Sequence, residues 1–269
     1  MTSCLKFCDI DQFKENGFAV FENLLPEGLV MTAAKEAEQL FANFPQESES
    51  QLTVYGDHDK SLEALSRIDH PHLASPAIAE LVKHKAFGEI AAKIMDGNAV
   101  QAWYIHMSRK PAASAARTHI GWHQDGQYSS FMDGRFVTAW IPLSVVEAAD
   151  SPICYVAGSH KLGMLGGSGF SGEVPLDTLK ERLLARCAIN WSETEVCARP
   201  GTVVMHDSFI IHGSRNNMAA RPRLALTVHM RSDRNHIHTA PPYRISLDHL
   251  KELRASPVLY GSASQFTDL

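Results

Sequence analysis

The chain has 269 residues, of which 45% are hydrophobic and 20% are charged, and its formal net charge is −5. These proportions are typical of an ordinary globular protein, and a negative chain without a run of Lys or Arg is not expected to bind nucleic acid. Its beginning lacks the apolar stretch of a signal peptide, and no uncharged apolar run is long enough to span a bilayer. Because the five cysteines show no paired-ligand spacing, we expect reduced thiols in a cytoplasmic protein that does not bind membranes.

The first hundred residues carry apolar side chains mainly at helical spacing. Helices are predicted over residues 9–16, 29–44, 62–68, 78–83 and 87–95. Asp9 is expected to cap the first of them and Gly17 to end it. A strand is predicted at residues 18–21, and the polar residues 46–60 are typical of a mobile loop.

From Val100 onward the pattern changes to strands. These are predicted over residues 100–107, 120–124, 136–146, 153–156, 202–205 and 224–230, with a helix at 176–188 and loops at 112–116 and 163–174. No linker rich in Pro or Ser separates the helical part from the strands. We therefore expect one domain over residues 1–269, with a mainly helical N-terminal part (1–99), a β core (100–240) and a C-terminal tail (241–269).

A candidate metal site lies in the stretch Gly121–Tyr128, which holds His123 and Asp125 one residue apart. On an extended strand this spacing puts both side chains on the same face. His212 follows far downstream, in Phe-Ile-Ile-His-Gly-Ser. Two imidazoles and one carboxylate form the facial triad of non-haem Fe(II) sites. A lone His-x-Asp is weak evidence, and many of the fourteen histidines are expected to be structural. The order His-x-Asp, His and then Arg favours a metal site.

Arg223 is the candidate anion-binding residue, because a guanidinium can hold a carboxylate with two parallel hydrogen bonds. Strand alternation puts it on one face with Ala225 and Thr227, whose small side chains leave room for a bound keto acid. Arg221 shares this face and is the rival. We favour a turn position for Arg221, because residues 217–222 are typical of a hairpin.

The chain resembles the phytanoyl-CoA dioxygenase family of Fe(II)- and 2-oxoglutarate-dependent oxygenases. The matching motifs are Trp-His-Gln-Asp at 122–125, Ala-Trp-Ile-Pro-Leu at 139–143, Gly-Ser-His-Lys at 158–161, His-Gly-Ser at 212–214 and Arg-Pro-Arg at 221–223. Near the front, Phe-Lys-Glu-Asn-Gly at 13–17 is similar to the family's usual opening. The resemblance implies a mainly β fold with flanking helices, built on a double-stranded β-helix (a cupin-like jelly roll) with the iron inside it.

The resemblance also implies roles for individual residues. His123, Asp125 and His212 would be the catalytic iron ligands, and Arg223 would hold the far carboxylate of 2-oxoglutarate with the help of Ser214. The co-substrate pocket would further involve Trp140, for which a core position is the alternative, together with Lys110 and His106. One departure is Asp-Ser-Pro at 150–152, where the family frequently has a glycine.

The expected reaction is hydroxylation of a C–H bond with dioxygen and 2-oxoglutarate, releasing succinate and CO2, with ascorbate as reductant. The substrate is expected to be a small anionic or zwitterionic metabolite, such as a carboxylate, an amino acid or a phosphonate. The alternatives are a non-catalytic protein on the same fold, which would be expected to lack a ligand or the arginine, and a hydrolytic or isomerising metal-binding cupin-like protein. The latter would not need Arg223. The sequence predicts no oligomeric state.

Two sets of side chains bear on the expected substrate. A positive rim is predicted around the cavity mouth, which would attract an anion; its members are Arg109, Lys110, Arg117, His119, Arg231, Arg234, His236 and His238. An aromatic frame for an alkylammonium group is predicted from Tyr104, Trp122, Tyr128 and Phe131. The alternative for the cations is an ordinary solvated surface.

Overall fold

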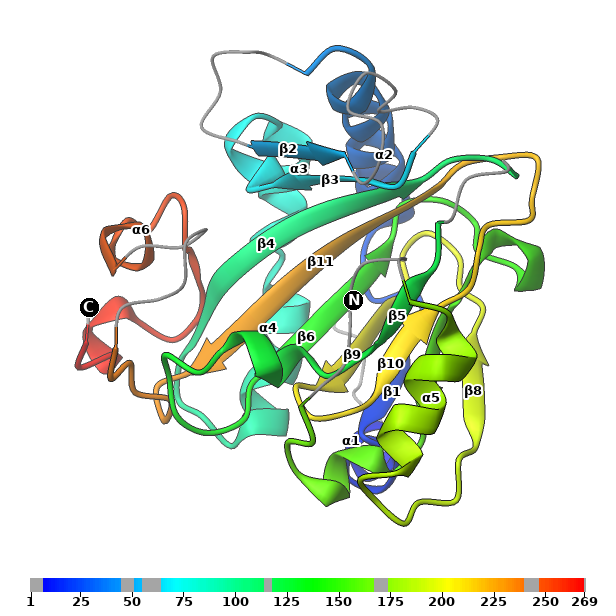
Figure 1. Ribbon diagram of the computed structural model, residues 1–269. Coiled ribbons are helices and arrows are strands. Elements are labelled where there is room, and N and C mark those ends of the chain that lie inside the picture. The colour runs from blue at the N-terminus through cyan, green and yellow to red at the C-terminus, as the bar shows by residue number, and fades with distance from the viewer. Residues whose placement is uncertain are drawn as a thin grey trace.

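Two antiparallel sheets form the centre of the protein in the computed structural model, which describes residues 7–44, 51–54, 64–113, 118–166, 174–239 and 247–268 (Figure 1). The eight-stranded sheet runs β1 (Phe18–Phe21), β9 (Val203–Asp207), β6 (Val137–Pro142), β11 (Arg223–Ser232), β4 (Val100–Lys110), β3 (Ser66–Asp69) and β2 (Gln51–Val54), with β12 (Val258–Tyr260) also on β4. The four-stranded sheet runs β5 (Ile120–His123), β10 (His212–Ser214), β7 (Ile153–Val156) and β8 (Glu193–Val196). The predicted fold class, mainly β with flanking helices, is confirmed.

Helices flank both sheets. They are α1 (Phe7–Asn16), α2 (Glu27–Ala42), α3 (Pro76–Val82), α4 (Lys85–Met95), α5 (Leu176–Leu184) and α6 (Leu247–Lys251). The predicted stop at Gly17 is confirmed, and this glycine has φ 82°, a left-handed conformation that favours residues without a Cβ. The predicted cap at Asp9 is wrong, because α1 already begins at Phe7.

Two predicted segments differ in the structure. Residues 66–68 of the predicted helix 62–68 belong to strand β3, and residues 51–54 of the predicted loop 46–60 form strand β2. The rest of that loop lies outside the described residues. Strand β3 pairs with β4 and β2 pairs with β3, so contacts with a partner distant in sequence override the weak local preference of both segments.

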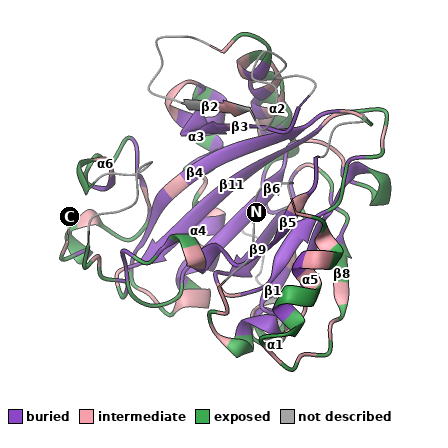
Figure 2. Cartoon of the chain, viewed as in Figure 1, coloured by how far each residue is buried: buried purple, intermediate pink, exposed green. Residues whose placement is uncertain are grey.

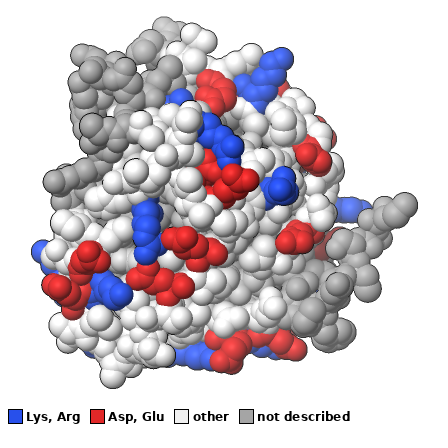
Figure 3. Space-filling model, turned by 90° about the vertical axis from the view of Figure 1, so that its right-hand side faces the viewer, with Lys and Arg blue, Asp and Glu red and all other residues white. Residues whose placement is uncertain are grey.

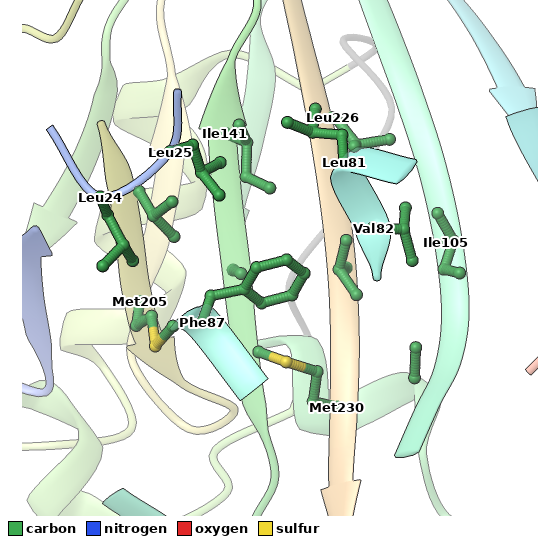
Figure 4. Packing of buried hydrophobic residues seen from close by; sticks show 14 of the residues in the cluster. Leu24, Leu25, Leu81, Val82, Phe87, Ile105, Ile141, Met205, Leu226 and Met230 are labelled. Atoms are coloured by element: carbon green, nitrogen blue, oxygen red, sulfur yellow. The ribbon is translucent and has the colours of Figure 1, made fainter. Parts of the chain in front are cut away.

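One face of the large sheet packs against α2, α3 and α4. Leu226 and Met230 of β11 lie on this face opposite Leu81 and Phe87 (Figure 4). All four side chains are fully buried, and burying a side chain of this size stabilises the fold by about 1.5–3 kcal/mol. The period of two along β11 follows the predicted alternation.

The other face of the large sheet faces the small sheet, and the candidate site lies in the space between the two sheets. Figure 2 shows that β4, β6 and β11 on one side and β5 on the other are buried along almost all of their length, whereas β8, at the edge of the small sheet, is partly exposed. The outer face of the small sheet is covered by α5, where Leu179 and Leu183 pack against Trp122 and Cys154. Each sheet is therefore closed by helices on its outside, and the remaining gap faces inward.

Charged side chains are mixed on the surface. On the face shown in Figure 3, Lys and Arg alternate with Asp and Glu in small groups among the described residues, without one large patch of a single sign. Within the described part of the chain, every helix is too short or too polar to cross a membrane.

The C-terminal segment closes one end of the large sheet through a buried ion pair. Arg231, at the end of β11, is fully buried, and its guanidinium donates two hydrogen bonds to Asp268, at 2.7 and 2.9 Å. The same guanidinium lies 4.7 Å from the centroid of the Phe266 ring. The tail therefore supplies the counter-charge for a cation that the strand buries.

Replacing Asp268 with Ala should leave the Arg231 guanidinium buried without its carboxylate. Loss of one partner from a fully buried pair costs about 3–5 kcal/mol, and partial exposure of Asp268 should reduce this to about 2 kcal/mol of unfolding free energy. Urea unfolding measures it. The control is Arg234→Ala, which breaks an exposed pair with Asp96 and should cost less than about 1 kcal/mol. Equal losses for the two variants would contradict this role of the tail.

The same pair should make stability depend on pH. Burial alone would raise the pKa of Asp268, but hydrogen bonds from Arg231 and from the Ile237 backbone N–H lower it overall. A carboxyl whose pKa is lower in the folded state stabilises the fold above its unfolded pKa of about 4, and loses this contribution as the pH falls through the folded pKa. The difference between wild type and Asp268→Ala should therefore be complete near neutral pH and shrink below about pH 4.

Candidate metal centre

The three predicted metal ligands meet between the two sheets. His123 ends β5, and His212, at the start of β10, lies directly opposite it in the antiparallel register. Asp125 does not follow on the strand as expected. The strand ends at His123, and Asp125 begins a 3₁₀ turn (Asp125–Tyr128), so that a turn and not strand alternation brings the carboxylate to the histidines. One ligand atom from each residue lies within 4.8 Å of the other two.

The hydrogen bonds of the two histidines determine which nitrogen faces the centre. His123 donates from Nδ1 to the backbone carbonyl of Gly121 at 2.8 Å, and His212 does the same to Ile210 at 3.1 Å. In the neutral rings, Nε2 then carries the lone pair. Each Nε2 lies 3.6 Å from Oδ1 of Asp125. Three acceptor atoms thus converge on one point, which is a stable arrangement when a cation lies between them.

The second oxygen of Asp125 is held by groups that the sequence reading missed. Oδ2 accepts a hydrogen bond from the Thr138 hydroxyl at 2.7 Å and one from His206 Nε2 at 3.1 Å. The other nitrogen of His206 pairs with the Tyr155 hydroxyl at 2.9 Å. A signal for Thr138 was present, because alternation along β6 places it on the same face as Trp140. These donors leave Oδ1 as the oxygen that faces the histidines.

The ionisation of the site suits a divalent cation. Burial would raise the pKa of Asp125, but the neighbouring histidines and its hydrogen bonds hold it well below the usual range. Burial lowers the pKa of His212 well below that of a free histidine. A carboxylate and neutral imidazoles are the donor set that non-haem Fe(II) takes, so the residues fit this metal.

A pocket surrounds the triad and extends to Arg223. Its lining residues are His106, Ser108, Ile120, His123, Asp125, Trp140, Ile153, His206, His212, Gly213, Ser214, Arg223, Thr227 and His229. Nε and Nη2 of Arg223 are buried without a hydrogen-bond partner among the described residues, and the guanidinium lies 5.7 Å from the centroid of the Trp140 ring. Burial lowers the pKa of Arg223 to about 10. A buried guanidinium with unpaired N–H groups fits a carboxylate ligand.

Arg221 occupies the turn position that we favoured for it. It is half-exposed and pairs with Asp150 at 2.6 Å and Glu147 at 3.2 Å. It does not line the pocket. Of the two arginines, Arg223 is therefore the one that faces the triad.

Lys110 lies behind the pocket and not on its wall. Its Nζ is buried and donates to Ser214 Oγ at 2.6 Å, Ser151 Oγ at 2.8 Å and the Arg215 carbonyl at 2.6 Å. Burial and the nearby Arg223 lower its pKa well below the usual value. Lys110 thus orients Ser214, which does line the pocket.

The turn that departs from the family pattern keeps the backbone shape of a glycine. Ser151 has φ 62°, in the left-handed region. Its hydroxyl accepts from Lys110 and donates to the Arg215 carbonyl at 2.5 Å. The Ser151 hydroxyl thus shares Lys110 with Ser214.

No member of the predicted positive rim lines the pocket, and the described members that pair with carboxylates do so elsewhere. Lys110 and Arg231 are fully buried. Arg109 pairs with Glu38, Arg234 with Asp96 and Arg231 with Asp268. His119 contacts the carbonyl of Val174, His236 and His238 are exposed, and Arg117 lies outside the described residues. The carboxylate partners of these arginines are distant in sequence, so the charges of neighbouring residues in the chain do not predict the ion pairs.

The predicted aromatic frame does not form either. Trp122 packs against Trp191 under α5, and Phe131 packs against Trp103. Tyr128 lies 6.4 Å from His123, between ring centroids. Of the four aromatics, Tyr104 contacts two residues of the pocket wall, His106 and His229, but does not itself line the pocket.

The sequence matches a known protein family and named relatives. The family model described as phytanoyl-CoA dioxygenase (PhyH) matches residues 13–225. An ectoine dioxygenase of Nocardia farcinica is 23% identical over 231 residues, which cover 80% of this chain and 74% of that protein.

Solved structures share the fold. EctD from S. alaskensis with 2-oxoglutarate and 5-hydroxyectoine has a TM-score of 0.66 at 20% identity, covering 87% of this chain and 78% of EctD. The epimerase SnoN in complex with Fe3+, alpha ketoglutarate and nogalamycin RO has a TM-score of 0.68 at 17% identity, covering 89% of this chain and 93% of SnoN. At these identities the likeness establishes the fold, a double-stranded β-helix of the cupin type.

Replacing Thr138 with Val should weaken Fe(II) binding roughly 10–100-fold, because residues that orient a metal ligand contribute this much to metal affinity. The variant keeps the side-chain shape but removes one donor to Asp125 and the acceptor for His229. Anaerobic Fe(II) titration measures it. The matched control is Thr227→Val on the neighbouring strand, since Thr227 lines the same pocket and makes no hydrogen bond to the triad. Unchanged affinity in Thr138→Val would refute the orienting role.

Proposed function

Because this chain belongs to the phytanoyl-CoA dioxygenase family and is an Fe(II)- and 2-oxoglutarate-dependent dioxygenase, we propose that it hydroxylates a C–H bond of a small zwitterionic metabolite. The observation that supports this most strongly is a single buried pocket with two complementary ends. One end has three acceptor atoms converging on a cation position, and the other has a buried, unpaired guanidinium.

Different residues of the pocket would bind the metal and the co-substrate. His123, Asp125 and His212 would hold Fe(II), and Arg223 would bind the far carboxylate of 2-oxoglutarate beside Ser214 and Trp140. When bound, Fe(II) and 2-oxoglutarate supply the activation of dioxygen, with release of succinate and CO2. The protein contributes the orientation of Asp125, the charge of Arg223 and a site enclosed between two sheets, which limits access of water.

The substrate class follows from the relatives and the pocket together. The relatives are named ectoine dioxygenases, and ectoine is a small zwitterion. The pocket wall has no free cation besides Arg223 among the described residues, so a purely anionic substrate would lack a second counter-charge. This favours a molecule that carries its own positive charge.

One domain over residues 1–269 is also part of the proposal. In support, the helices of the first hundred residues and the strands of the large sheet share one hydrophobic cluster. The alternative of a hydrolytic or isomerising cupin-like protein is not supported, because such a protein would have no use for the unpaired guanidinium of Arg223.

Replacing Arg223 with Leu should raise the apparent KM for 2-oxoglutarate strongly. Loss of a buried charge-assisted contact costs about 2–5 kcal/mol, equivalent to roughly 30-fold or more. Arg221→Leu is the matched control and should change this KM little, because its guanidinium pairs with Asp150 outside the pocket. Steady-state kinetics with varied 2-oxoglutarate measure both, and a larger effect of Arg221→Leu would contradict the assignment.

Succinate formation with Fe(II), 2-oxoglutarate and ascorbate tests the reaction itself. A zwitterionic substrate should increase succinate release and gain one oxygen atom from labelled dioxygen. Anaerobic Fe(II) with 2-oxoglutarate should give a visible charge-transfer band in the wild type, and Asp125→Ala and His212→Ala should lose it. A wild-type protein that binds neither 2-oxoglutarate nor Fe(II) would refute the proposed function.

A further inference from the structure

We infer that His106 and His229 form a subsite that accepts hydrogen bonds from an N–H-bearing cationic group of the substrate, an ammonium or an amidinium. This inference rests on the proposed function, and it identifies the part of the substrate that these two residues would recognise. His106 comes from β4 and His229 from the adjacent β11. Their ring centroids are 5.4 Å apart, and both rings line the pocket.

The hydrogen bonds around Asp125 fix the proton on His229. A carboxylate only accepts, so the hydroxyl proton of Thr138 is donated to Asp125 Oδ2, at 2.7 Å. The oxygen of Thr138 then accepts from His229 Nδ1, at 2.9 Å. His229 Nδ1 therefore carries the proton of the neutral ring, and Nε2 is left as an acceptor with no hydrogen bond among the described residues.

His106 adds a second unused polar atom beside it. Its side chain is more than nine-tenths buried, and Nδ1 has no hydrogen-bond partner in the described part of the chain. A buried polar atom without a partner costs about 1–3 kcal/mol, so such atoms usually mark a position that a ligand or water fills. Burial lowers the pKa of His106 well below that of a free histidine, so this ring is also neutral.

The surroundings favour a cation with N–H groups. Tyr104 lies 5.3 Å from His106 and 5.5 Å from His229, between ring centroids, and its hydroxyl proton is donated to Asp69 at 2.6 Å. Asp69 lies directly opposite His106 in the β3–β4 register and also pairs with Arg67 at 3.0 Å. The protons of Tyr104 and His229 are thus both donated to protein groups. What faces a ligand is therefore imidazole nitrogen, and a ring nitrogen with a free lone pair accepts from an N–H donor.

The subsite also has a useful position. His229 Nδ1 lies 3.6 Å from Asp125 Oδ2, so a group bound at Nε2 would lie beside the metal ligands. Arg223 lies toward the other end of the same strand face. A substrate held by its cationic group would therefore present neighbouring carbon atoms toward the metal, away from the guanidinium that serves 2-oxoglutarate.

The test uses the visible band of the anaerobic complex of the full-length protein with Fe(II) and 2-oxoglutarate, which responds to a molecule bound next to the metal. The probes are ectoine, an amidinium zwitterion; L-proline, a secondary ammonium zwitterion; and glycine betaine, a quaternary ammonium zwitterion without N–H groups. We expect at least one N–H-bearing probe to perturb the band saturably, and glycine betaine to bind at least tenfold more weakly or not at all.

Variants separate the subsite from general packing. His106→Leu, which keeps similar volume without nitrogen atoms, should weaken binding of the N–H-bearing probe at least tenfold. His106→Asn, which restores a polar atom near Nδ1, should recover part of it. The matched control is His72→Gln, because His72 is also buried with an unpartnered Nδ1 but lies outside the pocket lining; it should bind the probe like the wild type.

Three results would overturn the inference while leaving the proposed function intact. They are a band that forms but responds to neither N–H-bearing probe, equal binding of glycine betaine, and unchanged binding in His106→Leu. Absence of the band in the wild type would instead count against the proposed function, and the subsite would fall with it.

Discussion

The structure depends on a carboxylate buried between two sheets. An isolated ionised carboxylate in a protein interior is strongly unfavourable unless it is hydrogen-bonded or bound to a cation. Asp125 meets this constraint with one oxygen on Thr138 and His206 and the other on the metal side. Its donors must come from the large sheet. The inner face of that sheet is therefore polar around Thr138, although its outer face is packed with apolar side chains.

Strand β11 contributes side chains both to the pocket and to the hydrophobic core. Its odd-numbered residues carry Arg223, Thr227 and His229 into the pocket, while its even-numbered residues pack on the helices. A slip of one residue would exchange these two sets. The long pairing with β4 and β6 makes such a slip costly, because every residue pair of the ladder would change. The hydrophobic core thereby sets the position of the functional side chains.

The distribution of charge is as informative as the triad. Arginines and lysines that the sequence suggests as a substrate-attracting rim are used for structure, such as Arg231 with Asp268 and Lys110 with Ser214. What remains around the metal position is mostly imidazole, with Arg223 as the cation on the pocket wall. At the proposed subsite, selection of a ligand would depend on which nitrogen carries a proton. That is decided by hydrogen bonds to Asp125 and Thr138 and not by the net charge of the chain.

The sequence by itself determined the residue types of the site and the long elements. The triad motifs, Arg223 and Ser214 are recognisable from their order, and the helices α2 and α4 and strands β4, β7 and β11 from their apolar periods, because these signals are local. Only the tertiary structure decided the short strands β2 and β3, the turn that presents Asp125 and the donors on Thr138, His206 and His229. It also decided the partners of the arginines. Each of these depends on pairing between segments far apart in the chain, and a single residue or short segment does not encode its distant partner.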